Sequence, residues 1–138
     1  GICIDQRSGQ TTLLITEREQ NILKRFSLDG TFIEKFELPG AYICRPVIHG
    51  KEVYLATIWS GDKSPNTGFI SVLDETNRLV SAPGGIAPDY DSGGNLNPMR
   101  QESPLFKHPH DVGVDSDENL YVCQWNAGKT YPIKLVRV

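Results

Sequence analysis

The chain has 138 residues, of which 38% are hydrophobic and 22% are charged, and its formal net charge is −3. These values are those of one ordinary globular domain with a single core. The slightly acidic balance provides no basic stripe and disfavours a nucleic-acid partner, and no apolar run approaches the roughly 20 residues that a membrane-spanning helix needs. The chain shows no signal peptide and begins at Gly1 rather than Met. Removal of a leader is compatible with this start, so a periplasmic or secreted location stays open and the compartment is unknown.

Short runs of alternating apolar and polar residues predict β-strands, because no stretch sustains helical spacing of apolar residues across three turns. The first four predicted strands are residues 2–4, 13–15, 22–26 and 32–36. The next four are residues 42–47, 53–58, 68–73 and 79–80. A long segment at 83–107 reads as a loop, and three more strands follow at 111–114, 119–124 and 133–138. Two turns are predicted: a two-residue hairpin at Asp29-Gly30, and a tight turn at His49-Gly50.

Two segments of the chain resemble each other. GICID at 1–5 aligns with DVGVD at 111–115, and LLI at 13–15 aligns with LYV at 120–122. Repeats of about 40 residues with four short strands each are typical of propeller blades. The sequence therefore predicts an all-β partial β-propeller of about three four-stranded blades, at about 1–40, 41–82 and 108–138, with the last blade lacking its fourth strand.

Three blades do not close a ring, since known rings have at least about four. The two end blades would then expose apolar faces, and such faces promote association. We therefore expect a homo-oligomer, with two chains forming one ring, or contact with missing blades of the same propeller.

The pieces GICID, LLITEREQNILKRFSLDGTFIEKF and FKHPHDVGVDSDENLYVCQW resemble NHL repeats. Their order is similar to the C-terminal half of the peptidyl-α-hydroxyglycine α-amidating lyase family, whose fold is a six-bladed propeller. In that family three histidines on different blades hold zinc, an arginine and a tyrosine act on the substrate, and calcium is structural. The reaction releases glyoxylate and leaves a peptide amide.

Position by position, the resemblance implies that His110 is a zinc ligand, that Asp111 binds the structural calcium, and that Arg18 is the catalytic arginine. The positions of the other two zinc histidines and of the tyrosine fall outside this chain. One histidine does not make a zinc site, which needs three or four ligands. The chain is therefore interpreted as an NHL-type binding scaffold for a peptide or protein ligand that stays unknown. The alternative is a fragment of a zinc-dependent amidating lyase, with zinc and calcium bound only in a completed propeller.

The residues themselves leave further alternatives open. Arg18 is either a surface arginine paired with the glutamates on either side of it or an anion clamp at a channel mouth. Trp59 and Trp125 follow the second strands of their units, as Arg18 does, which predicts one rim carrying all three. Loop packing is the alternative role for the two tryptophans.

The remaining candidates are expected to be structural. His108 is interpreted as a loop residue, and His49 as a solvated turn residue. The acidic segment 89–95 lacks the spacing of an EF-hand and is interpreted as a flexible loop rather than a calcium site. Cys3, Cys44 and Cys123 have no CxxC spacing and are interpreted as small buried hydrophobic residues, with a disulfide or a zinc site as the alternative.

Overall fold

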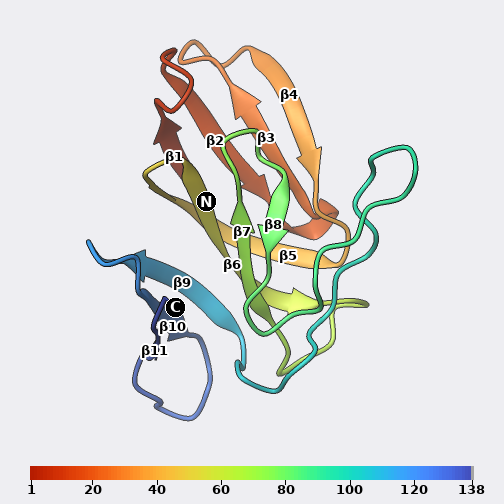
Figure 1. The fold of residues 1–138 in the computed structure, drawn as a ribbon, viewed down its shortest axis with the longest axis vertical. Helices are drawn as coiled ribbons and strands as arrows, with labels where there is room; N and C mark the ends of the chain where they lie inside the picture. Colours follow the sequence, from red (N-terminus) through yellow and green to blue (C-terminus); the bar gives the residue numbers. More distant parts are fainter. Residues whose placement is uncertain (138) are drawn as a thin grey trace.

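The computed structural model describes residues 1–137, which form three antiparallel sheets of four, four and three strands (Figure 1). The first sheet contains β1 (Ile2–Asp5), β2 (Thr12–Glu17), β3 (Ile22–Phe26) and β4 (Phe32–Glu37), with the 3-10 helix η1 (Arg18–Gln20) between β2 and β3. The second sheet contains β5 (Ala41–His49), β6 (Glu52–Ser60), β7 (Phe69–Leu73) and β8 (Leu79–Ser81). The third sheet contains β9 (Pro109–Val114), β10 (Leu120–Gln124) and β11 (Ile133–Leu135).

Each sheet is a meander in which strands that follow one another in the chain are neighbours. The prediction of an all-β chain with three strand groups is therefore confirmed. The last predicted strand, 133–138, ends at Leu135, and its final residue Val138 lies outside the described residues. Within residues 1–137, no helix has the length and apolar character required to cross a membrane.

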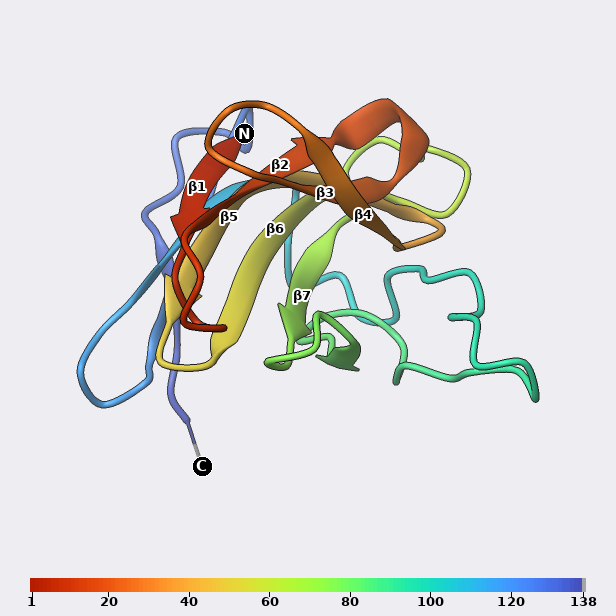
Figure 2. The same cartoon turned by 90° about the horizontal axis from the view of Figure 1, so that it is seen from above.

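The three sheets stack in chain order. β1 and β2 lie against β5, and β5 and β6 lie against β9. Figure 2 shows the first of these contacts from above, with β1 and β2 over β5 and β6. The first strand of each sheet therefore lies beside the first strand of the next sheet.

The second sheet is buried on both faces. Along β6, Val53 and Leu55 face the first sheet, whereas Tyr54, Ala56 and Ile58 face the third, as the two-residue period of a strand requires. All five side chains are buried. This double burial explains the nearly continuous apolar run of β6, because neither face meets water.

The first sheet has one face that no other sheet covers. Ile4, Leu13, Phe26 and Phe32 lie side by side across its four strands, and Ile2 and Ile15 form a second such row. Phe26 and Phe32 make an edge-to-face contact with ring centroids 5.6 Å apart. We call these six residues the open apolar face. Its outermost members are well exposed, at 54% for Ile2, 61% for Ile4 and 51% for Phe32.

The hairpin at Asp29-Gly30 is one residue longer than predicted. The Ser27 amide donates to the Thr31 carbonyl at 2.9 Å, so three residues lie between this pair, and Gly30 adopts a φ of +89°. A type I turn followed by a left-handed residue has this form. His49 does not lie in a turn either: it is the half-buried last residue of β5, pairs with Glu52, and the turn is Gly50-Lys51.

The connection between β8 and β9 has no helix or strand, but it packs closely on the sheets. Its two isolated bridges join Gly85 to Gln101 and Tyr90 to Leu96. Met99 and Phe106 are each 1% exposed, and they belong to the cores on the two sides of the second sheet. At the tip of this connection, Asp91 accepts hydrogen bonds from the backbone of Gly93 and Asn95, so its carboxylate holds its own turn.

Candidate functional site

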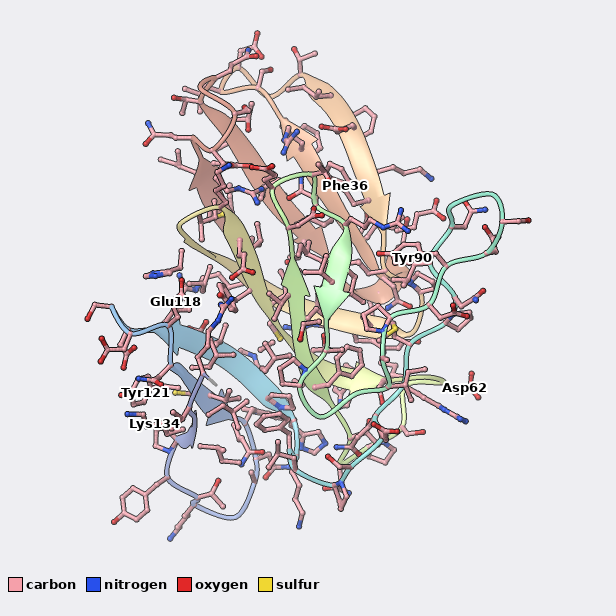
Figure 3. The ribbon with its side chains drawn as sticks, in the orientation of Figure 1. Phe36, Asp62, Tyr90, Glu118, Tyr121 and Lys134 are labelled. Carbon is pink, nitrogen blue, oxygen red and sulfur yellow. The ribbon has the colours of Figure 1, made fainter. Side chains whose placement is uncertain are left out.

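One end of the stack carries the connections between the second and third strands of each sheet. These are η1 in the first sheet, residues 61–68 in the second, and residues 125–132 in the third. Figure 3 labels Asp62, which marks the middle connection. We call this end the loop rim. Its main side chains are Arg18, Glu19, Tyr42, Trp59, Lys63, Asn66, His108 and Trp125.

Arg18 points from the first sheet onto the second. Its guanidinium donates to Cys44 Sγ at 3.2 Å and, at the long distance of 3.5 Å, to the Ile43 carbonyl. The two neighbouring glutamates have other partners, because Glu17 pairs with Lys24 and Glu19 pairs with Lys63. Among residues 1–137, Arg18 makes no ion pair, so its charge is available to a ligand at the rim.

Trp59 lies in an aromatic and cationic cluster with Tyr42 and Lys63. Its ring meets Tyr42 edge to face at 6.2 Å, and Lys63 Nζ lies 5.0 Å from the Trp59 ring centroid. The Lys63 ammonium also pairs with Glu19 at 2.6 Å, which connects η1 to the middle connection. A cation over an indole face is attractive because the ring carries a negative face.

Trp125 contacts His108, which in turn contacts Asn66 of the middle connection. The His108 backbone accepts from the Trp125 amide at 2.9 Å, and the two rings are 5.7 Å apart. His108 Nε2 accepts from the Asn66 amide at 2.9 Å, so in the neutral ring Nδ1 carries the proton. His108 is 6% exposed and has a φ of +51°, so it is a buried member of the loop, whereas Trp125 is 53% exposed.

The two predicted metal ligands, His110 and Asp111, are neighbours near the start of β9, but their side chains have different environments. His110 is exposed, and the Asp111 carboxylate accepts two hydrogen bonds from Arg45 Nη2, at 3.0 and 3.1 Å. Arg45 belongs to β5, so this ion pair links the second and third sheets. Residues 1–137 contain no group of three His, Cys, Asp or Glu side chains placed to hold a metal ion. Zinc at His110 and calcium at Asp111 stay predictions.

The three cysteines are free thiols in three different settings. Burial raises the pKa of Cys44, although the charge of Arg18 opposes it, and burial raises the pKa of Cys3 to about 11. The prediction of three buried cysteines is confirmed for Cys44, but Cys3 is only half-buried, and the prediction is wrong for Cys123, which is exposed. Its neighbour Val122 faces the core, so the alternation of β10 turns Cys123 to the uncovered face of the third sheet.

The structure places Arg18 and Trp125 on the connections of the first and third sheets and Trp59 near the end of β6, just before the middle connection, so all three lie at one rim. Sequence reasoning missed the residues that join them, namely Tyr42, Lys63, Asn66 and the buried His108. Lys63 and Asn66 lie in GDKSPNTG, a turn-rich stretch with no motif that marks either residue. The positive φ of both, +61° and +57°, is visible only in the structure.

No family model matches this sequence, and no curated protein matches it.

Proposed function

We propose that the chain is an NHL-type propeller unit that acts as a binding scaffold, with the loop rim as its binding surface for a peptide or protein. Three features support the propeller arrangement: each sheet is a meander, the sheets stack in chain order, and their first strands lie side by side. The middle sheet, buried on both faces, packs as a blade between two blades does.

The observation that carries the binding role is a guanidinium without an acidic partner among residues 1–137, at the same rim as the exposed Trp125 ring and the half-buried Trp59 ring. Arg18 is held by Cys44, and Trp125 is held by His108, so both groups are fixed before a ligand arrives. A fixed guanidinium binds a carboxylate through two hydrogen bonds, and exposed indoles supply contact area. Arg and Trp are also the residue types that dominate binding energies at interfaces.

The binding role predicts that peptides selected on this chain depend on Arg18 and Trp125. Peptides selected from a displayed library of random linear sequences should lose about 2 kcal/mol, or roughly thirtyfold in Kd, on Arg18→Met and on Trp125→Ala. The measurement is a fluorescence-anisotropy titration of each labelled peptide against each variant.

Two variants away from the rim are matched controls for this experiment. Arg137→Met removes a cation that pairs with Glu52 and Glu118, and Tyr121→Ala removes an exposed ring on the third sheet. Both should bind the selected peptides like the parent chain. Selected peptides that bind Arg18→Met and Trp125→Ala unchanged would show that the rim is not the binding surface.

We also propose that a second copy of the chain covers the open apolar face. Each contact between sheets in the chain buries an apolar face, and this face continues the same stack. Ile4→Lys places a charge on its most exposed member and should convert a dimer to a monomer, as measured by light scattering after size-exclusion chromatography. Leu28→Lys is the matched control, because Leu28 is 62% exposed but lies in the β3–β4 turn. A parent chain that is monomeric at micromolar concentration contradicts this assembly.

The amidating-lyase alternative stays a weaker prediction. It requires two further zinc ligands beside His110, and the described residues contain no group of three His, Cys, Asp or Glu side chains placed to hold a metal ion.

A further inference from the structure

A cavity of about 450 Å³ opens between the first and second sheets, and none of the named loop-rim side chains lines it. It lies between β4, the β7–β8 turn with β8, and residues 90–96 of the long connection. Figure 3 shows Phe36 and Tyr90, two of its lining residues, on different segments of the chain. Its volume is in the range of sites for small molecules.

A fixed guanidinium lies at one wall of this cavity. Arg78 Cζ is 3.5 Å from the centroid of the Tyr90 ring, and the Tyr90 hydroxyl donates to the Leu79 carbonyl at 2.9 Å. The ring is therefore anchored and forms a platform for the guanidinium. Within residues 1–137 the Arg78 side chain makes no ion pair and donates no hydrogen bond, so its N–H groups are free for a ligand.

A buried amide supplies a second donor. Arg7 Nη2 donates to Asn77 Oδ1 at 2.6 Å, and because arginine only donates, this contact fixes which end of the amide is oxygen. Asn77 is 3% exposed and lines the cavity, and its Nδ2 has no hydrogen-bond partner among the described residues. A buried donor without an acceptor is unfavourable, so a ligand acceptor at this place is favoured.

The other walls are apolar or neutralised. Phe36, Leu38, Leu79 and Leu96 line the cavity, and Leu38 and Leu79 are buried. Lys35 and Glu37 also line it, but they pair with each other at 2.7 Å. Thr76 and Asn95 line it as well, but the Thr76 hydroxyl donates to Asp74 and the Asn95 side-chain amide donates to Asp91. An unpaired positive charge and a free amide donor beside apolar side chains are the complement of a carboxylate attached to a flat apolar group.

We propose that this cavity binds a small aromatic or similarly flat carboxylate, with its carboxylate on Arg78 and Asn77 Nδ2 and its apolar part against Phe36 and Leu96. This cavity and the loop rim have different lining residues, so the proposed carboxylate site can be tested independently of the proposed binding role of the rim.

The test is a titration of the isotope-labelled chain with benzoate, followed by NMR. Benzoate should give saturable shifts of the Asn77 side-chain amide and of the backbone amides of Asn95 and Leu96. Benzamide has the same ring without the charge, and inorganic phosphate has charge without the ring. Both should bind at least about tenfold more weakly than benzoate, as expected when a charge-assisted hydrogen bond or the apolar contact is lost.

Two variants complete the test. Arg78→Gln should weaken benzoate at least about tenfold. Arg100→Gln should leave the benzoate affinity unchanged, since Arg100 is an exposed arginine of the β8–β9 connection that does not line the cavity. The proposal is overturned if benzoate gives no saturable shift, if benzamide or phosphate binds as tightly, or if Arg78→Gln binds like the parent.

Discussion

Asp5→Ala should destabilise the chain by about 3–5 kcal/mol, because it leaves the buried Arg7 guanidinium without a carboxylate and removes one of the two carboxylate partners of the partly buried Arg25. Asp5 is 1% exposed, and Arg7 donates to both of its oxygens at 2.9 Å. Arg25 Nη2 lies 3.3 Å from Asp5 Oδ2. Urea denaturation followed by circular dichroism measures the loss.

The effect is large because Arg7 also joins the two sheets. Its guanidinium donates to the Lys51 carbonyl at 3.0 Å, the Asp74 carbonyl at 3.2 Å and Asn77 Oδ1 at 2.6 Å. These acceptors lie in the β5–β6 and β7–β8 turns of the second sheet. Loss of Asp5 therefore weakens the contact between the first and second sheets as well as the β1–β2 turn that holds Arg7.

The same pair makes stability depend on pH. Burial opposes ionisation of Asp5, but the hydrogen bonds and charge of Arg7, together with the charge of Arg25, outweigh it and lower the Asp5 pKa. A lowered folded-state pKa stabilises fully above the unfolded value of about 4, and the contribution is lost as the pH falls toward the folded value. The parent should therefore lose more stability than Asp5→Ala between pH 5 and pH 3, as an approximate window.

Asp62→Ala is the matched control for Asp5→Ala. Asp62 is an exposed aspartate whose side chain makes no hydrogen bond or ion pair with residues 1–137, so its removal should change stability by no more than about 0.5 kcal/mol. A similar small change for Asp5→Ala would show that the buried ion pair does not stabilise the fold.

Gly68→Ala should cost roughly 2–4 kcal/mol, because the added methyl group has no room and the backbone disfavours it. A Cβ at this position would lie 2.4 Å from Pro109 Cδ and 2.4 Å from the Thr57 carbonyl oxygen. The φ of Gly68 is +143°, which side chains rarely adopt. Because Pro109 begins β9, the substitution should push the third sheet away from the second, and Trp125 emission should shift along with the lost stability.

Gly113→Ala separates this effect from the general effect of changing a glycine. A Cβ at Gly113 would meet no atom within 4 Å, and its φ is not in the left-handed region. This variant should be neutral or slightly stabilising, since alanine restricts the unfolded chain. Equal stability of the two alanine variants would mean that Pro109 does not need the close approach to Gly68.

The sequence predicts all eleven strands because short apolar-rich runs bounded by turn residues are a local signal, whether they alternate or are continuous as in β6. The buried polar network is not predictable in this way. Arg7 and Asn77 are 70 positions apart and meet only after the first two sheets stack. The cavity beside Arg78 is likewise built from three segments that are separate in the sequence, and nothing in the residues around Arg78 indicates that the Tyr90 ring will pack against its guanidinium.

The rim was predictable in part. Equivalent positions in a repeat indicate which residues follow equivalent strands, and this places Arg18, Trp59 and Trp125 at one end. The partners of each residue depend on side-chain packing between neighbouring sheets, which the repeat pattern does not encode. Arg18 therefore contacts Cys44 rather than either adjacent glutamate.

The double burial of the middle sheet explains why the two outer units, and not the central one, are visibly alike in sequence. An outer sheet has one solvent-exposed face, so its strands keep the alternation of apolar and polar residues that makes the two outer segments similar in sequence. The central sheet has no solvent-exposed face on which polar residues are tolerated. A sheet moved from the edge to the centre of this stack would therefore have to exchange the polar side chains of its outer face for apolar ones.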